Sequence, residues 1–321
     1  MAGEILTSIL RPSMLSTLVR AQLAAELLIA IALGAWLHRC GWNLAAVGAF
    51  LVAVSLGVRL LIVVTSSLVA HANRSPREPG QQVGFTGGVR VVLDEWRAML
   101  VDNFAWLPFE SVLVRADPPS GGPHVPVLTV HGYLSNRGLM RPVVDAMDRA
   151  GAEVHTFNFR GLFGSIEPLV DQLEAEVQRL LAASGHPQVV LVCHSMGGLV
   201  TRAWLARHGA QRVARLVTIA SPHHGTAIAK LGLGANARQM RQGSDFLRVL
   251  EAAEGGRGPA CPTTSIYSVH DNLVAPQETS RLPQATNIAL HGWGHVGIVA
   301  APPLHAAVVA ALREAGALPK P

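Results

Sequence analysis

The chain has 321 residues, of which 50% are hydrophobic and 15% charged, and its mean hydropathy is +0.32. This composition excludes a disordered or collagen-like chain, and it is unusually apolar for a wholly soluble protein. The net charge is +5, but the chain has only two lysines and 5% aromatic residues. Nucleic-acid binding needs clustered basic side chains with stacking aromatics, so we expect no nucleic-acid partner.

Two apolar runs dominate the amino-terminal region, at about residues 18–37 and 44–69, and a short polar turn separates them. The second run is longer than the ~20 residues needed to cross a bilayer, and the first reaches that length only if residues 18–22 are counted. We therefore predict a membrane-spanning helical hairpin over residues 1–72.

Three alternatives to a membrane hairpin remain open: a signal peptide, a buried hairpin in a soluble protein, and a pair of interfacial amphipathic helices. A signal peptide has about 15–30 residues, much less than this region. A helix that is apolar all round has no polar face to present to water, which disfavours the other two.

Basic residues flank the predicted hairpin on both sides, and the turn between its helices has fewer. Arg11 and Arg20 lie before the apolar core of its first helix, Arg74 and Arg77 follow its second helix, and Arg39 lies in the turn. By the positive-inside rule both ends face the cytoplasm, which predicts an inner-membrane location with the remaining chain in the cytoplasm. The three widely spaced cysteines contain no CxxC pair, which indicates neither a disulfide framework nor a zinc site and suits a reducing compartment.

Each predicted span has a charged residue well inside it. Glu26 is in the first and Arg59 in the second, roughly one helical turn apart in height if the helices are antiparallel. The two could pair across the hairpin, or each could face protein or the membrane interface separately.

A change in composition marks a domain boundary after the hairpin. Residues 73–88 are rich in Pro, Gly, Gln and Arg, which predicts a linker, followed by a domain over residues 89–321. In that domain β-rich runs alternate with helical ones, which predicts an α/β fold with a mostly parallel sheet covered by helices on both faces. The strands are expected at 125–130, 153–159 and 189–193, and the helices near 139–150 and 168–183.

A sharp turn follows the apolar run at residues 189–193, within the sequence VVLVCHSMGG. It places Ser195 at the tip between a strand and a helix, which is the pattern of a nucleophile elbow. There the amino end of the helix favours a developing oxyanion. Gly197 and Gly198 supply the small neighbours that such a turn needs. Cys193 occupies the position of the first glycine in the G-x-S-x-G pattern, and it is small enough to fit.

Two further motifs make a resemblance specific. His131, Gly132 and Tyr133 follow the run that ends at residue 130, and residues 221–226 read SPHHGT after a predicted strand at 216–220. With the elbow, these motifs resemble the α/β-hydrolase superfamily, and within it the bacterial lipases, over about residues 122–300.

The resemblance implies an α/β-hydrolase fold and chemistry that needs no metal or organic cofactor. It also implies that the backbone N–H groups of Tyr133 and Met196 form an oxyanion hole. His131, Gly132, His194 and Gly197 are then motif residues that support the site, and His194 is expected to point away from the nucleophile.

The superfamily order of catalytic residues is Ser, then Asp, then His, each on a loop after a strand. The predicted strand at 264–269 is followed by Asp271, and that at 287–290 by His295. We predict Asp271 as the acid and His295 as the base. His291 remains an alternative base, and Glu278 or Asp245 an alternative acid.

A long segment, residues 226–262, separates the SPHHGT motif from the acid. Its middle, residues 237–250, is predicted to be helical. The segment is either a lid over an acyl-binding pocket or one more helix that covers the sheet.

Together these patterns predict a membrane-anchored serine hydrolase that cleaves carboxylic esters, with lipid-like acyl esters as the favoured substrate class, through an acyl-enzyme. The expected partners are the acyl-ester substrate and the bilayer, and the oligomeric state is left open. An acyltransferase or a thioesterase would use the same residues. From a different class, a non-catalytic membrane scaffold with this fold is the other alternative.

Overall fold

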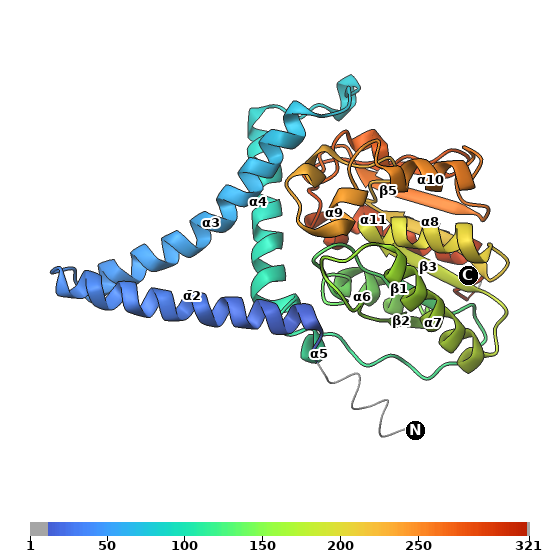
Figure 1. The fold of residues 1–321 in the computed structure, drawn as a ribbon, viewed down its shortest axis with the longest axis horizontal. Helices are drawn as coiled ribbons and strands as arrows, with labels where there is room; N and C mark the ends of the chain where they lie inside the picture. Colours follow the sequence, from blue (N-terminus) through green and yellow to red (C-terminus); the bar gives the residue numbers. More distant parts are fainter. Residues whose placement is uncertain (1–11, 320–321) are drawn as a thin grey trace.

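The computed structural model describes residues 12–319, and its centre is a six-stranded sheet (Figure 1). The strand order is β2-β1-β3-β4-β5-β6, and every neighbouring pair is parallel. The strands are β1 (Val127–Val130), β2 (Val154–Thr156), β3 (Val189–His194), β4 (Val213–Ile219), β5 (Thr263–Ser268) and β6 (Thr286–Leu290). The predicted α/β class is confirmed.

Helices cover both faces of the sheet because its strands are apolar on both faces. Along β3, Val190 and Val192 face the core shared with α6 (Arg141–Arg149) and α11 (Pro302–Glu314). Leu191 and Cys193 face the opposite core, shared with α7 (Glu167–Ser184), α8 (Met196–His208) and α10 (Asp245–Ala253). This alternation is the period-2 geometry of a strand, and it places both cores against one sheet.

The chain changes direction across the sheet after β2. From β1 it crosses to β2 at one edge, and it then returns to β3 on the other side of β1. The carboxyl ends of β1 and β3 therefore lie side by side at a switch point, where open α/β sheets bind ligands.

Two long helices precede this domain, α2 (Met14–Arg39) and α3 (Leu44–Ala72), capped by the side chains of Ser13 and Asn43. Both are long and apolar enough to cross a membrane, and only 6% and 17% of their most apolar windows are buried. A core helix of a soluble domain would be mostly buried, so this exposure disfavours that alternative. Residues 1–11 of the predicted hairpin, with Arg11, and residues 320–321 lie outside the described residues.

Glu26 and Arg59 meet across the hairpin. The Arg59 guanidinium lies 2.8 Å from a Glu26 carboxylate oxygen and also bonds to Ser55. It lies 4.6 Å from the ring centre of Phe104 as well. Of the two alternatives for Glu26 and Arg59, the structure therefore has the ion pair.

The chain between hairpin and sheet contains more helix than the sequence predicts. After η1 (Pro79–Gln81), α4 (Phe85–Val101) begins inside the segment expected as a linker, so the last four residues of 73–88 are helical. The glycines at 87 and 88 indicated a loop, but tertiary packing overrides them. The Trp96 indole N–H donates to the Leu56 carbonyl of α3 at 3.1 Å, and α4 lies between the hairpin and the sheet (Figure 1). A π-helical turn, η2 (Asp102–Trp106), and α5 (Glu110–Leu113) follow.

The helix expected over residues 237–250 is two helices. After η3 (Ala227–Lys230), α9 (Gly234–Gln239) ends, and α10 begins only at Asp245. Two local features cause the break: Gly243 has φ +69°, and the Ser244 side chain caps α10 by accepting from the Leu247 N–H. The remaining short helices are η4 (Gln277–Ser280) and η5 (Gly297–Ala300).

Candidate active site

Ser195 occupies a strained turn between β3 and α8. Its φ of 53° and ψ of −125° are unusual for a residue with a side chain. The Ser195 N–H donates to the Ile219 carbonyl at 2.8 Å, and the Gly198 N–H donates to the Ser195 carbonyl. These hydrogen bonds hold the Ser195 backbone in its strained conformation. They leave the Ser195 hydroxyl at the start of α8, where the helix dipole favours negative charge.

Glycines pack directly against this turn. A Cβ added to Gly132 would lie 2.8 Å from the Ser195 Cβ, and one on Gly197 would lie 2.5 Å from the Val130 carbonyl oxygen. At Gly198 it would lie 2.4 Å from the Ser221 hydroxyl. The loop after β1 can approach the elbow only because these positions carry no side chain.

The glycine contacts predict a stability effect. Gly197→Ala is expected to destabilise the fold by about 1–3 kcal/mol, because its methyl group overpacks against backbone that cannot move aside. Gly164→Ala is the matched control, since a Cβ there meets nothing within 4 Å. Thermal unfolding in detergent would compare the two, and equal melting temperatures would contradict the prediction.

Three predicted site residues form one hydrogen-bonded chain. The His295 Nε2 lies 3.0 Å from the Ser195 hydroxyl, and the His295 Nδ1 lies 2.8 Å from Asp271 Oδ2. Asp271 is 2% exposed, and its other oxygen accepts the N–H groups of Leu273 and Val274 at 2.7 and 2.8 Å. The arrangement has a hydroxyl, a base that can take its proton, and a fixed carboxylate that orients the base.

The charge balance around His295 favours its protonated form. Burial by itself would lower the pKa of His295, but the adjacent Asp271 carboxylate more than offsets this and raises the pKa above its usual value. Next to it, burial and the charge on His295 hold the pKa of His194 well below the usual range. His194 is therefore neutral, and its ring lies 4.8 Å from that of His295.

The alternative acids and base lie apart from this chain of hydrogen bonds. His291, Glu278 and Asp245 are all exposed, and Asp245 pairs with Arg248 on α10. None of the three contacts Ser195 or His295 among the described residues.

Tyr133 and Met196 carry the two backbone amides expected to bind an oxyanion. An added Cβ on Gly132 would lie 3.4 Å from the Met196 nitrogen, so the loop after β1 lies directly against the start of α8. His131 anchors this loop: its Nε2 accepts the Phe159 N–H at 3.0 Å, and burial lowers its pKa to about 4. His131 is thus a neutral structural residue.

Cys193 ends β3 just before the elbow. It is fully buried, its sulfur lies 3.1 Å from the Thr201 hydroxyl, and burial raises its pKa to about 12. A thiol held protonated in this way is a packing residue rather than a nucleophile.

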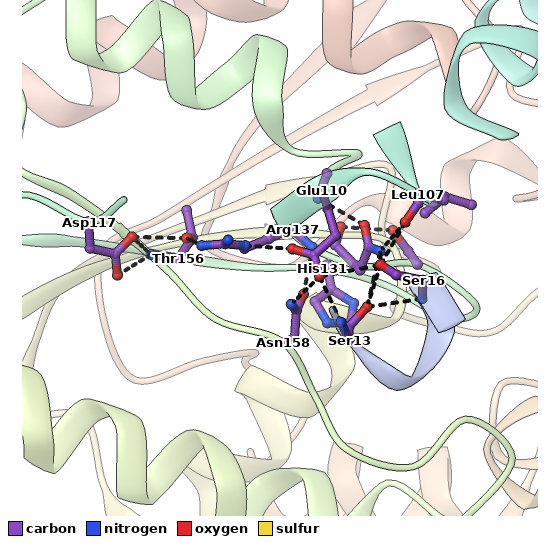
Figure 2. A network of polar contacts seen from close by, with 12 residues as sticks. Ser13, Ser16, Leu107, Glu110, Asp117, His131, Arg137, Thr156 and Asn158 are labelled. Atoms are coloured by element: carbon purple, nitrogen blue, oxygen red, sulfur yellow. Dashed lines mark hydrogen bonds and ion pairs between the residues drawn. The ribbon is translucent and has the colours of Figure 1, made fainter. Parts of the chain in front are cut away.

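The start of α2 is joined to the loop after β1 by a buried polar network (Figure 2). The Ser16 hydroxyl donates to the Leu107 carbonyl at 2.7 Å, and Asn136 donates to the same carbonyl and to Ser16. Glu110 accepts the Ser13 N–H and forms a buried ion pair with Arg137 at 2.6 Å. The network fixes the loop that carries Tyr133 to the hairpin.

The end of α3 contacts the acid and base loops. Asn272 donates to the Ser66 hydroxyl at 2.9 Å, and its oxygen accepts the His295 N–H at 3.0 Å. From α4, Glu95 accepts the N–H groups of Val296 and Gly297. Sequence reasoning missed Ser66, Glu95 and Asn272. Only the position of Asn272 beside Asp271 could have indicated one of them.

The inserted segment is divided between two roles. α10 packs on α8 through Leu247 and Leu250, as a sheet-covering helix does. The part before α9 instead meets the site, since the Tyr133 hydroxyl donates to the Leu233 carbonyl at 2.8 Å. Four large apolar side chains are exposed on or beside this region, at Leu134, Phe163, Leu231 and Leu233. We call these four residues the apolar rim.

Comparisons with known proteins agree with the fold and with the motifs. A family model described as the alpha/beta hydrolase fold matches residues 125–243. Aspergillus fumigatus lipase B superposes with a TM-score of 0.56 at 23% identity, covering 63% of this chain and 56% of that one. The mature lipase BlEst2 of Bacillus licheniformis superposes with a TM-score of 0.52 at 17% identity, covering 60% and 96%. The chain therefore has the α/β-hydrolase fold.

Sequence relatives cover a smaller part. A triacylglycerol lipase of Pseudarthrobacter phenanthrenivorans is 36% identical over 113 residues, which is 32% of this chain and 35% of that lipase. The lysosomal thioesterase PPT2 of Rattus norvegicus is 30% identical over 137 residues, 40% of this chain and 45% of that enzyme. The chain thus spans between about a third and a half of the length of these relatives.

Proposed function

We propose that this protein is a membrane-anchored serine hydrolase that cleaves carboxylic esters with lipid-like acyl groups. The observation that carries the proposal is the hydrogen-bonded chain from Ser195 through His295 to Asp271. It is supported by the α/β-hydrolase fold and by sequence relatives that are lipases and thioesterases.

Each residue has a role in the proposed reaction. Ser195 attacks the ester carbonyl while His295 takes its proton, and the Tyr133 and Met196 amides donate to the oxyanion. Asp271 holds the tautomer of His295 that accepts at Nε2, and it stabilises the imidazolium. His295 then gives the proton to the leaving alcohol, and water releases the acyl group from Ser195 in the reverse sequence.

Membrane anchoring rests on α2 and α3. In this proposal residues 1–72 form the membrane hairpin, residues 89–321 the catalytic domain, and the basic flanks hold that domain in the cytoplasm. The start of α2, the end of α3 and α4 each contact a loop at the carboxyl edge of the sheet. The candidate site therefore faces the base of the hairpin, which favours substrates that reside in the bilayer.

The exposed apolar rim supports the same substrate class. Large exposed apolar side chains beside the loop of Tyr133 favour an apolar acyl chain over a sugar or a peptide. The η3–α9 half of the inserted segment, which contacts Tyr133, is the part proposed as a lid.

Thioester hydrolysis is the second candidate, because the thioesterase relative is 30% identical over 137 residues. The chemistry differs only in the leaving group. An acyltransferase would use the same residues with an alcohol in place of water, and a scaffold would use none of them.

The activity should depend on pH through His295, which must be neutral to accept the Ser195 proton. Because the Asp271 carboxylate raises the pKa of His295, we expect kcat/KM to reach half its maximum above the ordinary histidine value of about 6.5. A pH profile with a soluble short-chain ester would measure this. A half-maximum below that value would contradict the predicted charge balance.

The direct test of function uses the full chain purified in detergent. We expect hydrolysis of p-nitrophenyl esters to increase from acetate towards palmitate, and a fluorophosphonate probe to label Ser195, as located by mass spectrometry. An acyl-thioester of matched length tests the second candidate in the same assay. Failure of every ester and of the probe would favour the scaffold.

A further inference from the structure

The loop that carries His295 is held by side chains at three successive backbone N–H groups. Asn272 accepts the first, from His295 itself. Glu95 accepts the next two, from Val296 at 2.9 Å and from Gly297 at 2.7 Å, with one carboxylate oxygen for each. Glu95 belongs to α4, more than 190 residues earlier in the chain. Val296 is the residue before η5 and Gly297 is its first residue, so Glu95 accepts two N–H groups at the start of this helix from a distant element.

The fit between Glu95 and this loop leaves no room for a side chain. A Cβ on Gly294 would lie 2.4 Å from the Glu95 carboxyl carbon, and one on Gly297 would lie 3.1 Å from its Oε2. Glu95 is 2% exposed, so water cannot replace it as the acceptor. Trp96, the next residue, fixes α4 to α3. The loop therefore fits closely around the carboxylate, and the contact of Trp96 with α3 fixes the helix that carries it.

Glu95 has a second buried carboxyl nearby, that of Asp102. Burial raises the pKa of Asp102 to about 8, and the negative charge of Glu95 raises it further in the same direction. Asp102 Oδ1 has no hydrogen-bond partner within residues 12–319, whereas both oxygens of Glu95 accept N–H groups. Burial raises the pKa of Glu95 above its usual value, and the two N–H groups offset only part of that rise. Of two adjacent carboxyls only one ionises easily, and the hydrogen bonds select Glu95.

We infer that Glu95 is a positioning residue for the catalytic base: its carboxylate holds the backbone of residues 296–297 and adds a second negative charge that favours the His295 imidazolium. The inference rests on the proposed function, since it assigns His295 as the base. Within residues 12–319, the charged or titratable groups that face His295 are Asp271, Glu95 and the neutral His194. Asp271 orients the His295 ring directly. Glu95 acts by holding the loop that carries His295 and by the electrostatic effect of its negative charge on the imidazolium.

The test compares Glu95→Gln with wild type in the full chain. A carboxamide keeps the shape but has only one acceptor oxygen and no charge. We expect kcat to fall about tenfold with KM changed less than about twofold, because the loss affects the transition state more than substrate binding. Loss of the negative charge also lowers the pKa of His295, so the acidic limb of kcat/KM should move to lower pH by about half a unit or more.

Asp94→Asn is the matched control, because Asp94 precedes Glu95 on α4 but is partly exposed, and its ion pairs within the described residues are with Arg90 and Arg97. It should retain the wild-type rate and pH profile. The Glu95→Gln comparison is repeated with Asp102→Asn present in both proteins, so that ionisation of Asp102 cannot replace the lost charge.

The outcomes separate a positioning role from a structural one. Wild-type kcat in the Glu95→Gln protein overturns the inference. The inference is also overturned if kcat and the melting temperature both fall while the acidic limb of the pH profile stays in place. If Glu95→Gln does not fold, Gly294→Ala displaces the carboxylate from the loop side and should shift the limb in the same direction; an unshifted limb there also overturns it. A wild-type protein without esterase activity or probe labelling would instead refute the proposed function.

Discussion

Replacing Ser195 with alanine should lower kcat for ester hydrolysis by about 10⁶-fold, the loss typical when the nucleophile of such a triad is removed. The methyl group cannot form an acyl-enzyme, and nothing else in the elbow replaces the hydroxyl, since Cys193 is buried and protonated. Residual rate would come from the oxyanion donors alone. The measurement is hydrolysis of a p-nitrophenyl ester and fluorophosphonate labelling in detergent.

Ser184→Ala, at the far end of α7, provides the control for this substitution and should leave both readouts unchanged. Because Ser195 keeps its strained φ through backbone hydrogen bonds, the alanine variant should also fold with a similar melting temperature. Retained labelling of Ser195→Ala at another serine would show that the nucleophile lies elsewhere.

Asp271→Asn should reduce kcat by about 10⁴-fold through the tautomer of His295 rather than through the fold. The asparagine oxygen can still accept from Leu273 and Val274, so its amide nitrogen is directed at the His295 Nδ1. That nitrogen can only donate, which forces Nδ1 to accept and moves the ring proton to Nε2. Nε2 then cannot take the proton of Ser195.

The two exposed carboxyls that the sequence left as alternative acids serve as controls. Asp245→Asn and Glu278→Gln should each retain wild-type kcat, because both side chains are exposed and apart from His295. The measurement is kcat at saturating ester together with the melting temperature. A large loss in either control, with Asp271→Asn still active, would reassign the acid.

In the proposed function, the contacts of α2, α3 and α4 with the site loops give these helices a second role beside membrane anchoring. The Figure 2 network fixes the loop of Tyr133 to α2, and Asn272 bonds to Ser66 near the end of α3. In the proposed function, the helices that reach the membrane also support the oxyanion amides and the base. We therefore expect the activity to depend on whether the hairpin lies in a bilayer or in detergent. If α2, α3 and α4 shift, the site loops lose their contacts with them and can open.

Much of the fold and of the candidate site could be predicted from local sequence patterns. Alternating apolar runs indicated the parallel sheet because strands buried on both faces must be apolar throughout. Ser195 was visible because the elbow needs small residues at fixed offsets from it, and Asp271 and His295 because each follows a strand in the expected order. These features depend on the backbone within a few residues, and so the sequence records them locally.

Other features depended on contacts between distant segments. A glutamate within an amphipathic helix resembles any solvated charge, and Glu95 differs only because its partners lie more than 190 residues away. The glycines at 87 and 88 predicted a loop, and packing on α3 made a helix of it. The sequence by itself determined the fold class and the residues that meet at Ser195. Only the tertiary structure decided what holds them in place. A charged side chain such as Glu95 becomes a fixed hydrogen-bond partner only when it is buried, and burial is a property of the packed chain.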